Sequence, residues 1–267
     1  KNFSFKNLVL NSDLLINSFS LMFIYTFNFL IGLITLPYLI KIYGIENWGN
    51  IAFLQIFLNY LIWLVDWSFN QYSLKFISIN RENQQNKNKI FQDTISAQFL
   101  LAIFCIAITL ITFTIWNQYE YVLYGFILII IGNLLQSYWF LNGLEKIYET
   151  ALLQFFNKLI FSILILNKLN SNSGIFQYFL YYGICYFLTG LICQLIIKFK
   201  YKIKIYKIDF HEGINLLKKS SNLFKASIYG SLVNSTIPLF IKTIIGINAL
   251  GIYNIADRIK GMSVQIT

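Results

Sequence analysis

Residues 94–116 read TISAQFLLAIFCIAITLITFTIW, an apolar run that contains no charged side chain. Crossing the hydrocarbon core of a bilayer takes about 20 consecutive helical residues. A helix is suited to that environment because it satisfies its own backbone hydrogen bonds where no water is present. The run therefore predicts a transmembrane helix, and the chain around it has the character of a membrane protein.

The composition of the whole chain supports this interpretation. Of its 267 residues, 57% are hydrophobic and 12% are charged, and the mean hydropathy is +0.61. An ordinary soluble domain carries roughly 25% charged residues. Half that charge cannot cover a soluble surface of this size. The composition argues against a cytosolic enzyme and predicts an all-α polytopic membrane protein.

Further runs of the same length and character extend along the chain. They predict spans near residues 14–40, 48–72, 94–116, 121–141, 150–166, 174–197 and 226–247. An eighth span begins near residue 252 and is cut by the end of the chain. We therefore expect the chain to be truncated, with more spans in the natural protein.

The positive charge separates the loops into two groups. Lys and Arg outnumber Asp and Glu by 21 to 11, and fifteen of these cations fall in segments on the side of the N-terminus. The opposite loops hold two, Lys41 and Lys168. The positive-inside rule then predicts a cytoplasmic N-terminus. Nucleic-acid binding by the basic loop 198–225 is an alternative, but topology alone accounts for such cations, and we expect no nucleic-acid partner.

Two stretches of the chain resemble each other. Residues 36–52 read LPYLIKIYGIENWGNIA and residues 237–256 read IPLFIKTIIGINALGIYNIA. Each has a proline, a lysine four residues later, two glycines spaced five apart and an Ile-Ala pair. Chance in a biased sequence is the alternative to a true repeat. A repeat predicts a six-helix lobe over residues 1–213 and the start of a second lobe over 214–267, an arrangement typical of transporters.

Polar residues form a stripe along one face of each of five predicted spans. A polar group facing lipid without a partner costs several kcal/mol, so the stripes should point inward. Hydrogen bonds between helices, worth about 0.6 kcal/mol each, are the simpler explanation of one stripe, whereas five favour a water-filled cavity. The stripes are Asn17, Asn28, Gly32 and Thr35; Gln55, Asn59, Asp66 and Asn70; Asn133, Gln136 and Ser137; Thr150, Gln154, Asn157 and Lys158; and Ser231, Ser235, Pro238 and Lys242.

The ionisable members of the stripes carry most of the functional argument. A lysine at the centre of a span costs roughly 2.5–3.5 kcal/mol. Lys158 is explained by a function that uses its charge or by a carboxylate partner such as Asp66, and the alternative is snorkelling to the cytoplasmic surface. Asp66 has the alternative of pairing with a loop lysine. For Lys242 we favour snorkelling to the outer surface.

Motifs for enzymatic chemistry are absent from the sequence. It contains no G-x-x-x-x-G-K-[ST], H-E-x-x-H or G-x-S-x-G motif. The three cysteines lie in apolar runs, and His211 has no Cys or His near it in sequence, so we expect no disulfide framework, metal or cofactor. No loop is long enough for a soluble catalytic domain. We therefore expect a protein that is not an enzyme.

Four segments resemble the polysaccharide (O-antigen, Wzx-type) flippase family of the multidrug/oligosaccharidyl-lipid/polysaccharide (MOP) exporter superfamily. They are LPYLIKIYGIENWGNIAFLQ (36–55), VDWSFNQYSLKFISINREN (65–83), QSYWFLNGLEK (136–146) and LGIYNIADRI (250–259). The third is similar to the family's Gln-x-x-Trp-Phe-x-x-Gly-x-Glu signature. The chain departs from the family at Ser68, where glycine is usual, and at Ile241, where an aspartate often stands. The second departure puts ion coupling by the seventh helix in doubt.

The resemblance implies a MOP-type fold, here the first six-helix bundle and the start of the second, around a polar cavity. It implies translocation of an undecaprenyl-pyrophosphate-linked oligosaccharide across the bacterial cytoplasmic (inner) membrane by alternating access, driven by an ion gradient. We expect the pyrophosphate to meet Lys158 and Arg81, and an ion or proton to meet Asp66. The expected sugar contacts are Asn28, Asn59, Gln154 and Asn157. The expected partners are this substrate, membrane lipids and other polysaccharide-assembly membrane proteins.

Three other functions were weighed against this one. A small-molecule drug/cation antiporter of the same superfamily is the nearest alternative. A membrane polysaccharide polymerase or ligase needs a large outer loop with arginines, and the predicted outer loops are short and contain none. A structural scaffold would leave Lys158 and the five stripes unexplained.

Overall fold

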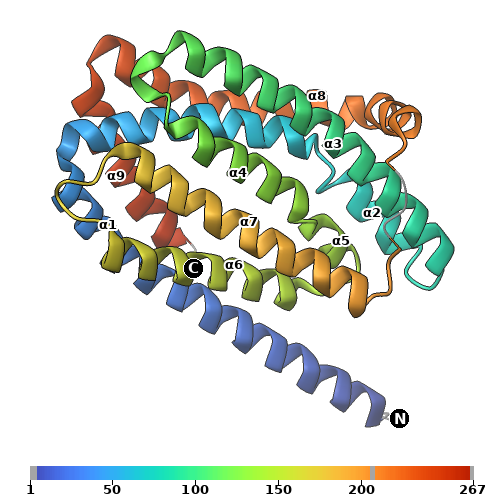
Figure 1. Ribbon diagram of the computed structural model, residues 1–267. Coiled ribbons are helices and arrows are strands. Elements are labelled where there is room, and N and C mark those ends of the chain that lie inside the picture. The colour runs from blue at the N-terminus through green and yellow to red at the C-terminus, as the bar shows by residue number, and fades with distance from the viewer. Residues whose placement is uncertain (1–4, 205–207, 265–267) are drawn as a thin grey trace.

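The computed structural model describes residues 5–204 and 208–264, which are helical throughout their length apart from short connections, and no strand occurs among them. The helices run alongside one another in a layered bundle (Figure 1). They are α1 (Phe5–Asp66), α2 (Tyr72–Ile79), α3 (Gln84–Ile115), the 3-10 helix η1 (Asn117–Tyr119), α4 (Val122–Leu135), α5 (Tyr138–Gly143), α6 (Ile147–Lys168), α7 (Ile175–Phe199), α8 (Phe210–Ile244) and α9 (Ile247–Val264).

Five helical segments are long and apolar enough to cross a membrane: Thr26–Asp66, Gln84–Ile115, Val122–Gly143, Ile147–Lys168 and Ile175–Phe199. The chain is thus an all-α polytopic membrane protein, as its composition predicts. The first two predicted spans both lie on α1, and the next four correspond to the remaining segments. The seventh lies on α8, where the side chains of residues 229–235 are outside the described part of the chain.

The ends of several elements differ from the prediction for local reasons. The second span was expected to reach residue 72, but α1 ends at Asp66 because Trp67 and Ser68 have φ values of 41° and 63°. A right-handed helix cannot continue through such residues. The expected loop 198–225 is also wrong in its second half, since α8 begins at Phe210. The Asp209 carboxylate caps that helix by accepting hydrogen bonds from the backbone of His211 and Glu212.

A sharp bend at Gly44 divides α1 into two arms. Its φ of 70° and ψ of 172° are non-helical, and the positive φ favours glycine. The bend lies with the α3–α4, α6–α7 and α8–α9 connections at one end of the bundle, which we call the kink end (Figure 1). The N-terminus, α2, α5 and the segment that follows α7 lie at the other end, which we call the basic end.

Polar contacts join the connections at the basic end. The Lys200 ammonium pairs with the Glu149 carboxylate at 2.8 Å, and the Tyr201 hydroxyl donates to the same oxygen at 2.6 Å. Burial and this neighbouring carboxylate raise the pKa of Tyr201 above its ordinary value. The contacts hold the end of α7 against the start of α6.

Helices α4 and α7 approach so closely that only glycine fits between them. A Cβ on Gly132 would lie 2.6 Å from the backbone of Tyr186, and one on Gly190 would lie 2.7 Å from the carbonyl oxygen of Gly132. Gly125 and Gly183 repeat the arrangement seven residues earlier on each helix, with Gly183 directed at the Gly125 carbonyl at 2.7 Å. Small residues at such positions are a common device of helix packing in membranes. They make α4 and α7 the tightly packed centre of the bundle.

The two similar sequence stretches contact each other at the kink end. A Cβ on Gly49 would lie 2.2 Å from the carbonyl oxygen of Ile247, and one on Gly251 would lie 2.6 Å from that of Ile45. In the sequence alignment of the stretches, Gly49 corresponds to Gly251 and Ile45 to Ile247. Gly246, which corresponds to Gly44, also has a positive φ, of 117°. The contact is therefore reciprocal, as expected for two copies of one structural unit facing each other.

The domain division at residues 213 and 214 stays a prediction. That boundary falls in the first turn of α8. Gly213 lies against α3, since its Cβ would be 3.1 Å from the backbone nitrogen of Ala97.

Candidate functional site

A polar cavity of about 430 Å³ lies among α1, α6, α7 and the break between α4 and α5. Its walls combine amides, hydroxyls, one ammonium group and aromatic rings. The lining residues are Asn28, Gly32, Thr35, Leu36, Gln136, Tyr138, Gln154, Asn157, Lys158, Phe161, Ser162, Tyr182 and Tyr186.

Two of the predicted polar stripes line this cavity from opposite sides. From α1 come Asn28, Gly32 and Thr35, and from α6 come Gln154, Asn157 and Lys158. The side chain of Asn17, which was assigned to the first stripe, lies outside the described residues, as do Ser231 and Ser235 of the last. Residues of these two stripes thus line one pocket between helices far apart in sequence, and their roles toward a ligand stay predictions.

The Lys158 ammonium is the cation in the cavity wall. It donates a hydrogen bond of 2.5 Å to the backbone carbonyl of Asn28. The ion pairs found among the described residues do not include Lys158, so the suggested partner Asp66 does not neutralise it. A charge held in a membrane bundle by one neutral carbonyl is available to an incoming anion.

Of the two asparagines near Lys158, one has a side-chain hydrogen-bond partner and the other has an acceptor without one. Asn157 Nδ2 donates to the Thr189 hydroxyl at 2.8 Å, which fixes its orientation. Asn28 is 8% exposed, and its Oδ1 is buried without a hydrogen-bond partner among the described residues. A buried acceptor without a partner is costly. The Asn28 side chain is therefore suited to accept a hydrogen bond from a ligand hydroxyl.

Tyrosines of α7 form the third wall. Tyr178, Tyr182 and Tyr186 follow one another at intervals of four, and adjacent ring centroids are 6.2 and 4.7 Å apart. The Tyr182 hydroxyl donates to that of Tyr186 at 3.1 Å, and Gln136 Nε2 donates to the Tyr186 carbonyl at 3.1 Å. Tyr182 and Tyr186 line the cavity. Their ring faces and hydroxyls offer an amphipathic surface.

Asp66 lies behind this wall and does not line the cavity. Its carboxylate accepts a hydrogen bond of 3.1 Å from Asn133 Nδ2, and it lies near Tyr186. The suggested pairing with a loop lysine is absent among the described residues. Asp66 is thus held by a neutral amide next to a residue that reaches the cavity.

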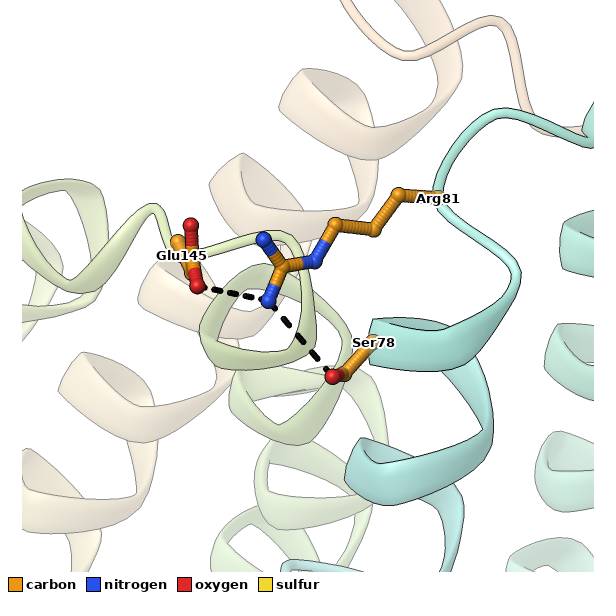
Figure 2. A network of polar contacts seen from close by, with 3 residues as sticks. All are labelled: Ser78, Arg81 and Glu145. Atoms are coloured by element: carbon orange, nitrogen blue, oxygen red, sulfur yellow. Dashed lines mark hydrogen bonds and ion pairs between the residues drawn. The ribbon is translucent and has the colours of Figure 1, made fainter.

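Asn59 and Arg81 are not brought to the cavity. Asn59 is exposed on α1 and is absent from the lining. Arg81 lies at the basic end, where its guanidinium pairs with Glu145 Oε1 at 2.6 Å and lies 3.5 Å from the Ser78 hydroxyl (Figure 2). The pair joins the turn after α2 to the turn after α5. An anion arriving at Arg81 would compete with Glu145.

Arg258 of α9 brings a second cation toward the same region. Its guanidinium donates to Gln55 Oε1 at 2.6 Å and to Asn254 Oδ1 at 3.0 Å, and it lies 4.8 Å from the Trp48 ring. Gln55 in turn donates to the Tyr178 hydroxyl at 2.8 Å. Arg258 on α9 is thus joined through Gln55 to Tyr178 of the α7 tyrosines, and Lys158 on α6 lines the cavity beside Tyr182 and Tyr186.

Comparison with known proteins identifies the family of the chain. The sequence matches the family described as "Polysaccharide biosynthesis protein" over residues 14–266. The chain belongs to the polysaccharide biosynthesis protein family.

Two curated relatives carry the printed name "Putative O-antigen transporter". The one from Escherichia coli (strain K12) is 25% identical over 236 residues, covering 87% of this chain and 57% of its own length. The one from Shigella dysenteriae is 29% identical over 168 residues, covering 62% of this chain and 42% of its own. The chain thus spans about half the length of these relatives. No solved structure matches it.

Within this family member, sequence reasoning missed Arg258 and the α7 tyrosines. Arg258 lies in the segment LGIYNIADRI that carries part of the family resemblance, but it belongs to none of the five polar stripes. The tyrosines do not stand out because aromatic residues make up 18% of the whole chain. Their spacing of four residues was the available signal.

Proposed function

We propose that this chain is part of a flippase that moves an undecaprenyl-pyrophosphate-linked oligosaccharide across the bacterial cytoplasmic membrane. The observation that carries the proposal is the cavity, in which several amides and a lysine without an ion pair among the described residues are held inside a membrane bundle. The family match and the names of the relatives support polysaccharide transport. The substrate class and the mechanism are our inference.

The lining suits the two chemical parts of such a substrate. Lys158 of the lining, together with Arg258 of α9, which does not itself line the cavity, provides positive charge for a pyrophosphate, which ammonium and guanidinium groups bind by charge-assisted hydrogen bonds. Asn28, Gln154 and Asn157 provide amide donors and acceptors for sugar hydroxyls. Arg81 remains our candidate for a first contact at the basic end, where the substrate would displace Glu145. Asn59 would contact sugar only in another arrangement of the helices.

Transport by such a site requires that it open to each side of the membrane in turn. We infer that α8 and α9 move with a second lobe against α1–α7, as parallel repeats do in other transporters. Asp66 is our candidate for the coupling ion or proton, because it is a carboxylate held by a neutral amide next to the cavity wall. We place the basic end on the cytoplasmic side, in accordance with the positive-inside rule.

Complementation of a flippase-deficient bacterial strain with the full-length gene tests the proposal. Export of surface glycan should be restored by the wild type and lost with Lys158→Ala. Lys168→Ala is the matched control, because Lys168 lies on the same helix, is exposed and is outside the cavity. Membrane abundance of each variant is measured in parallel.

Normal glycan export by Lys158→Ala at normal abundance would show that the cavity assignment is wrong. Efflux of small cationic drugs without any effect on glycan export would instead identify an antiporter and contradict the proposed substrate class.

A further inference from the structure

A second crevice, distinct from the cavity, lies at the kink end between α1, α3, η1 and α8. Its volume is about 530 Å³, and we call it the Lys242 crevice. It is lined by Phe53, Ile115, Trp116, Asn117, Tyr119 and Lys242.

Lys242 supplies the charge of this crevice without a counter-ion. Its ammonium lies over the face of Phe53, 3.0 Å from the ring centroid. The ion pairs found among the described residues do not include it. A cation–π contact stabilises an ammonium group but leaves its N–H donors available to an acceptor. The Lys242 side chain therefore directs its ammonium into the crevice, and snorkelling of this lysine to the outer surface stays a prediction.

The walls around Lys242 are held in place. Phe53 and Trp116 contact each other with ring centroids 5.5 Å apart, and the Tyr119 hydroxyl donates to Asn50 Oδ1 at 3.2 Å. Aromatic rings with a polar edge are typical of the interface between hydrocarbon and headgroups. The crevice therefore has the composition of a headgroup-level site.

Apolar surface borders the crevice on two sides. Ile111 and Ile115, one turn apart on α3, are 62% and 72% exposed, and Ile245, just after α8, is 71% exposed. On helices that cross a membrane, such surface contacts acyl chains. A ligand that fills the crevice thus meets a cation and aromatic edges at one end and a hydrocarbon-facing surface at the other.

We propose that the Lys242 crevice binds the phosphate headgroup of an anionic phospholipid of the surrounding membrane. The phosphate meets the Lys242 ammonium, and the acyl chains lie along Ile111 and Ile115. Because Lys242 is on α8 and the other walls are on α1, α3 and η1, one lipid contacts elements from both ends of the chain. It would favour the arrangement in which α8 stays beside α1. The proposal depends on the membrane location but not on which cargo the cavity carries.

Quenching of Trp116 by brominated lipid tests this proposal directly. The full-length protein is placed in nanodiscs of zwitterionic lipid that contain either dibrominated phosphatidylglycerol or dibrominated phosphatidylcholine. The signal of Trp116 is the difference between the wild type and Trp116→Phe. We expect phosphatidylglycerol to quench this signal at lower mole fraction than phosphatidylcholine does.

Substitution of Lys242 then identifies the charge responsible. Lys242→Gln should weaken the preference for phosphatidylglycerol about fivefold, the loss expected for one cation at a membrane surface, and Lys242→Arg should retain it. Lys41→Gln is the matched control, because Lys41 occupies the equivalent position in the first repeat and does not line the crevice.

Equal quenching by the two lipids in the wild type would overturn the proposal, as would an unchanged preference in Lys242→Gln. Displacement of the brominated phosphatidylglycerol by inorganic phosphate would also overturn it, because the site would then bind a free anion. None of these readouts depends on glycan export, so the failure of this proposal is distinguishable from that of the flippase assignment.

Discussion

Ser68 has a left-handed backbone conformation in a turn where the related family usually has glycine. Its φ is 63°, and its hydroxyl lies 2.9 Å from that of Ser227 on α8. A side chain in this conformation costs about 1 kcal/mol or more, because its Cβ crowds the following carbonyl. The hydrogen bond to α8 offsets part of that cost. The turn thus combines local strain with a contact between distant parts of the chain.

This balance predicts different effects for two small substitutions. Ser68→Gly and Ser68→Ala both remove the hydrogen bond, but only alanine retains the strain. We expect the glycine variant to be more stable than the alanine variant by about 1 kcal/mol, measured by thermal unfolding of the purified full-length protein. Equal stability of the two variants would show that the turn is not strained.

Arg258 is the second residue whose contacts make a prediction. Its charge-assisted hydrogen bond to Gln55 joins α9 to α1, and loss of such a bond costs about 1.5–3 kcal/mol. Arg258→Gln should therefore lower glycan export about tenfold or more in the complementation assay. Asp257→Asn is the control, since Asp257 is adjacent and exposed. If both variants export glycan equally, Arg258 has no role in transport.

Among single residues, sequence alone found Asn28, Gln154, Asn157 and Lys158, because their helical spacing reports a shared face. It could not find the Gln55–Arg258 contact, which joins residues 203 positions apart. Nor could it place Arg81, because the ion pair of Arg81 with Glu145 forms only where the turns after α2 and α5 meet. Spacing within one helix is encoded locally, whereas contact between helices is a property of the packed bundle.

Among whole elements, the glycine contact between α4 and α7 predicts a position intolerant of any side chain. Gly190→Val would direct two methyl groups at the Gly132 carbonyl, which is 2.7 Å from the Cβ position. We expect a loss of stability of about 1–3 kcal/mol and reduced membrane abundance. Thermal unfolding of the solubilised protein measures the effect.

Gly261→Val is the matched control for this substitution. Gly261 is also a helical glycine, but its Cβ position has nothing within 4 Å. The same change of residue type is therefore expected to have little effect there. Similar destabilisation by both variants would attribute the effect to valine in a helix and not to the α4–α7 contact.

The sequence predicts the helices whose existence depends on hydropathy. It does not predict helix ends that depend on the contacts of single residues. The apolar runs predicted the membrane helices because the bilayer requires about 20 apolar residues. The break after Leu135 and the helical start of α8 at Phe210 were not predicted, since they depend on packing and on the Asp209 cap. The extra length of α8 reflects polar helical sequence that hydropathy cannot distinguish from a loop.

For the whole molecule, the separation of charge between the two ends predicts its orientation in the membrane. Cys105, Cys185 and Cys193 are buried, so an impermeant maleimide should react mainly with introduced cysteines. In intact cells, Asn117→Cys at the kink end should be labelled and Lys202→Cys at the basic end should not. In sealed inverted membrane vesicles the pattern should be reversed, with Lys202→Cys labelled and Asn117→Cys protected, and after permeabilisation both should be labelled.

Labelling of Lys202→Cys in intact cells would contradict a cytoplasmic basic end. It would leave the fold unaffected, because the positions of the two ends relative to each other follow from contacts such as Lys200–Glu149 and Gly49–Ile247.

The reciprocal contact of Gly49 and Gly251 affects how the sequence of this chain can evolve. In a dimer of identical subunits, a substitution at such a position would alter both halves of the interface at once. In a single chain that carries both copies, a substitution at Gly49 alters one half and leaves the Gly251 half intact. Each copy is then free to diverge by small steps.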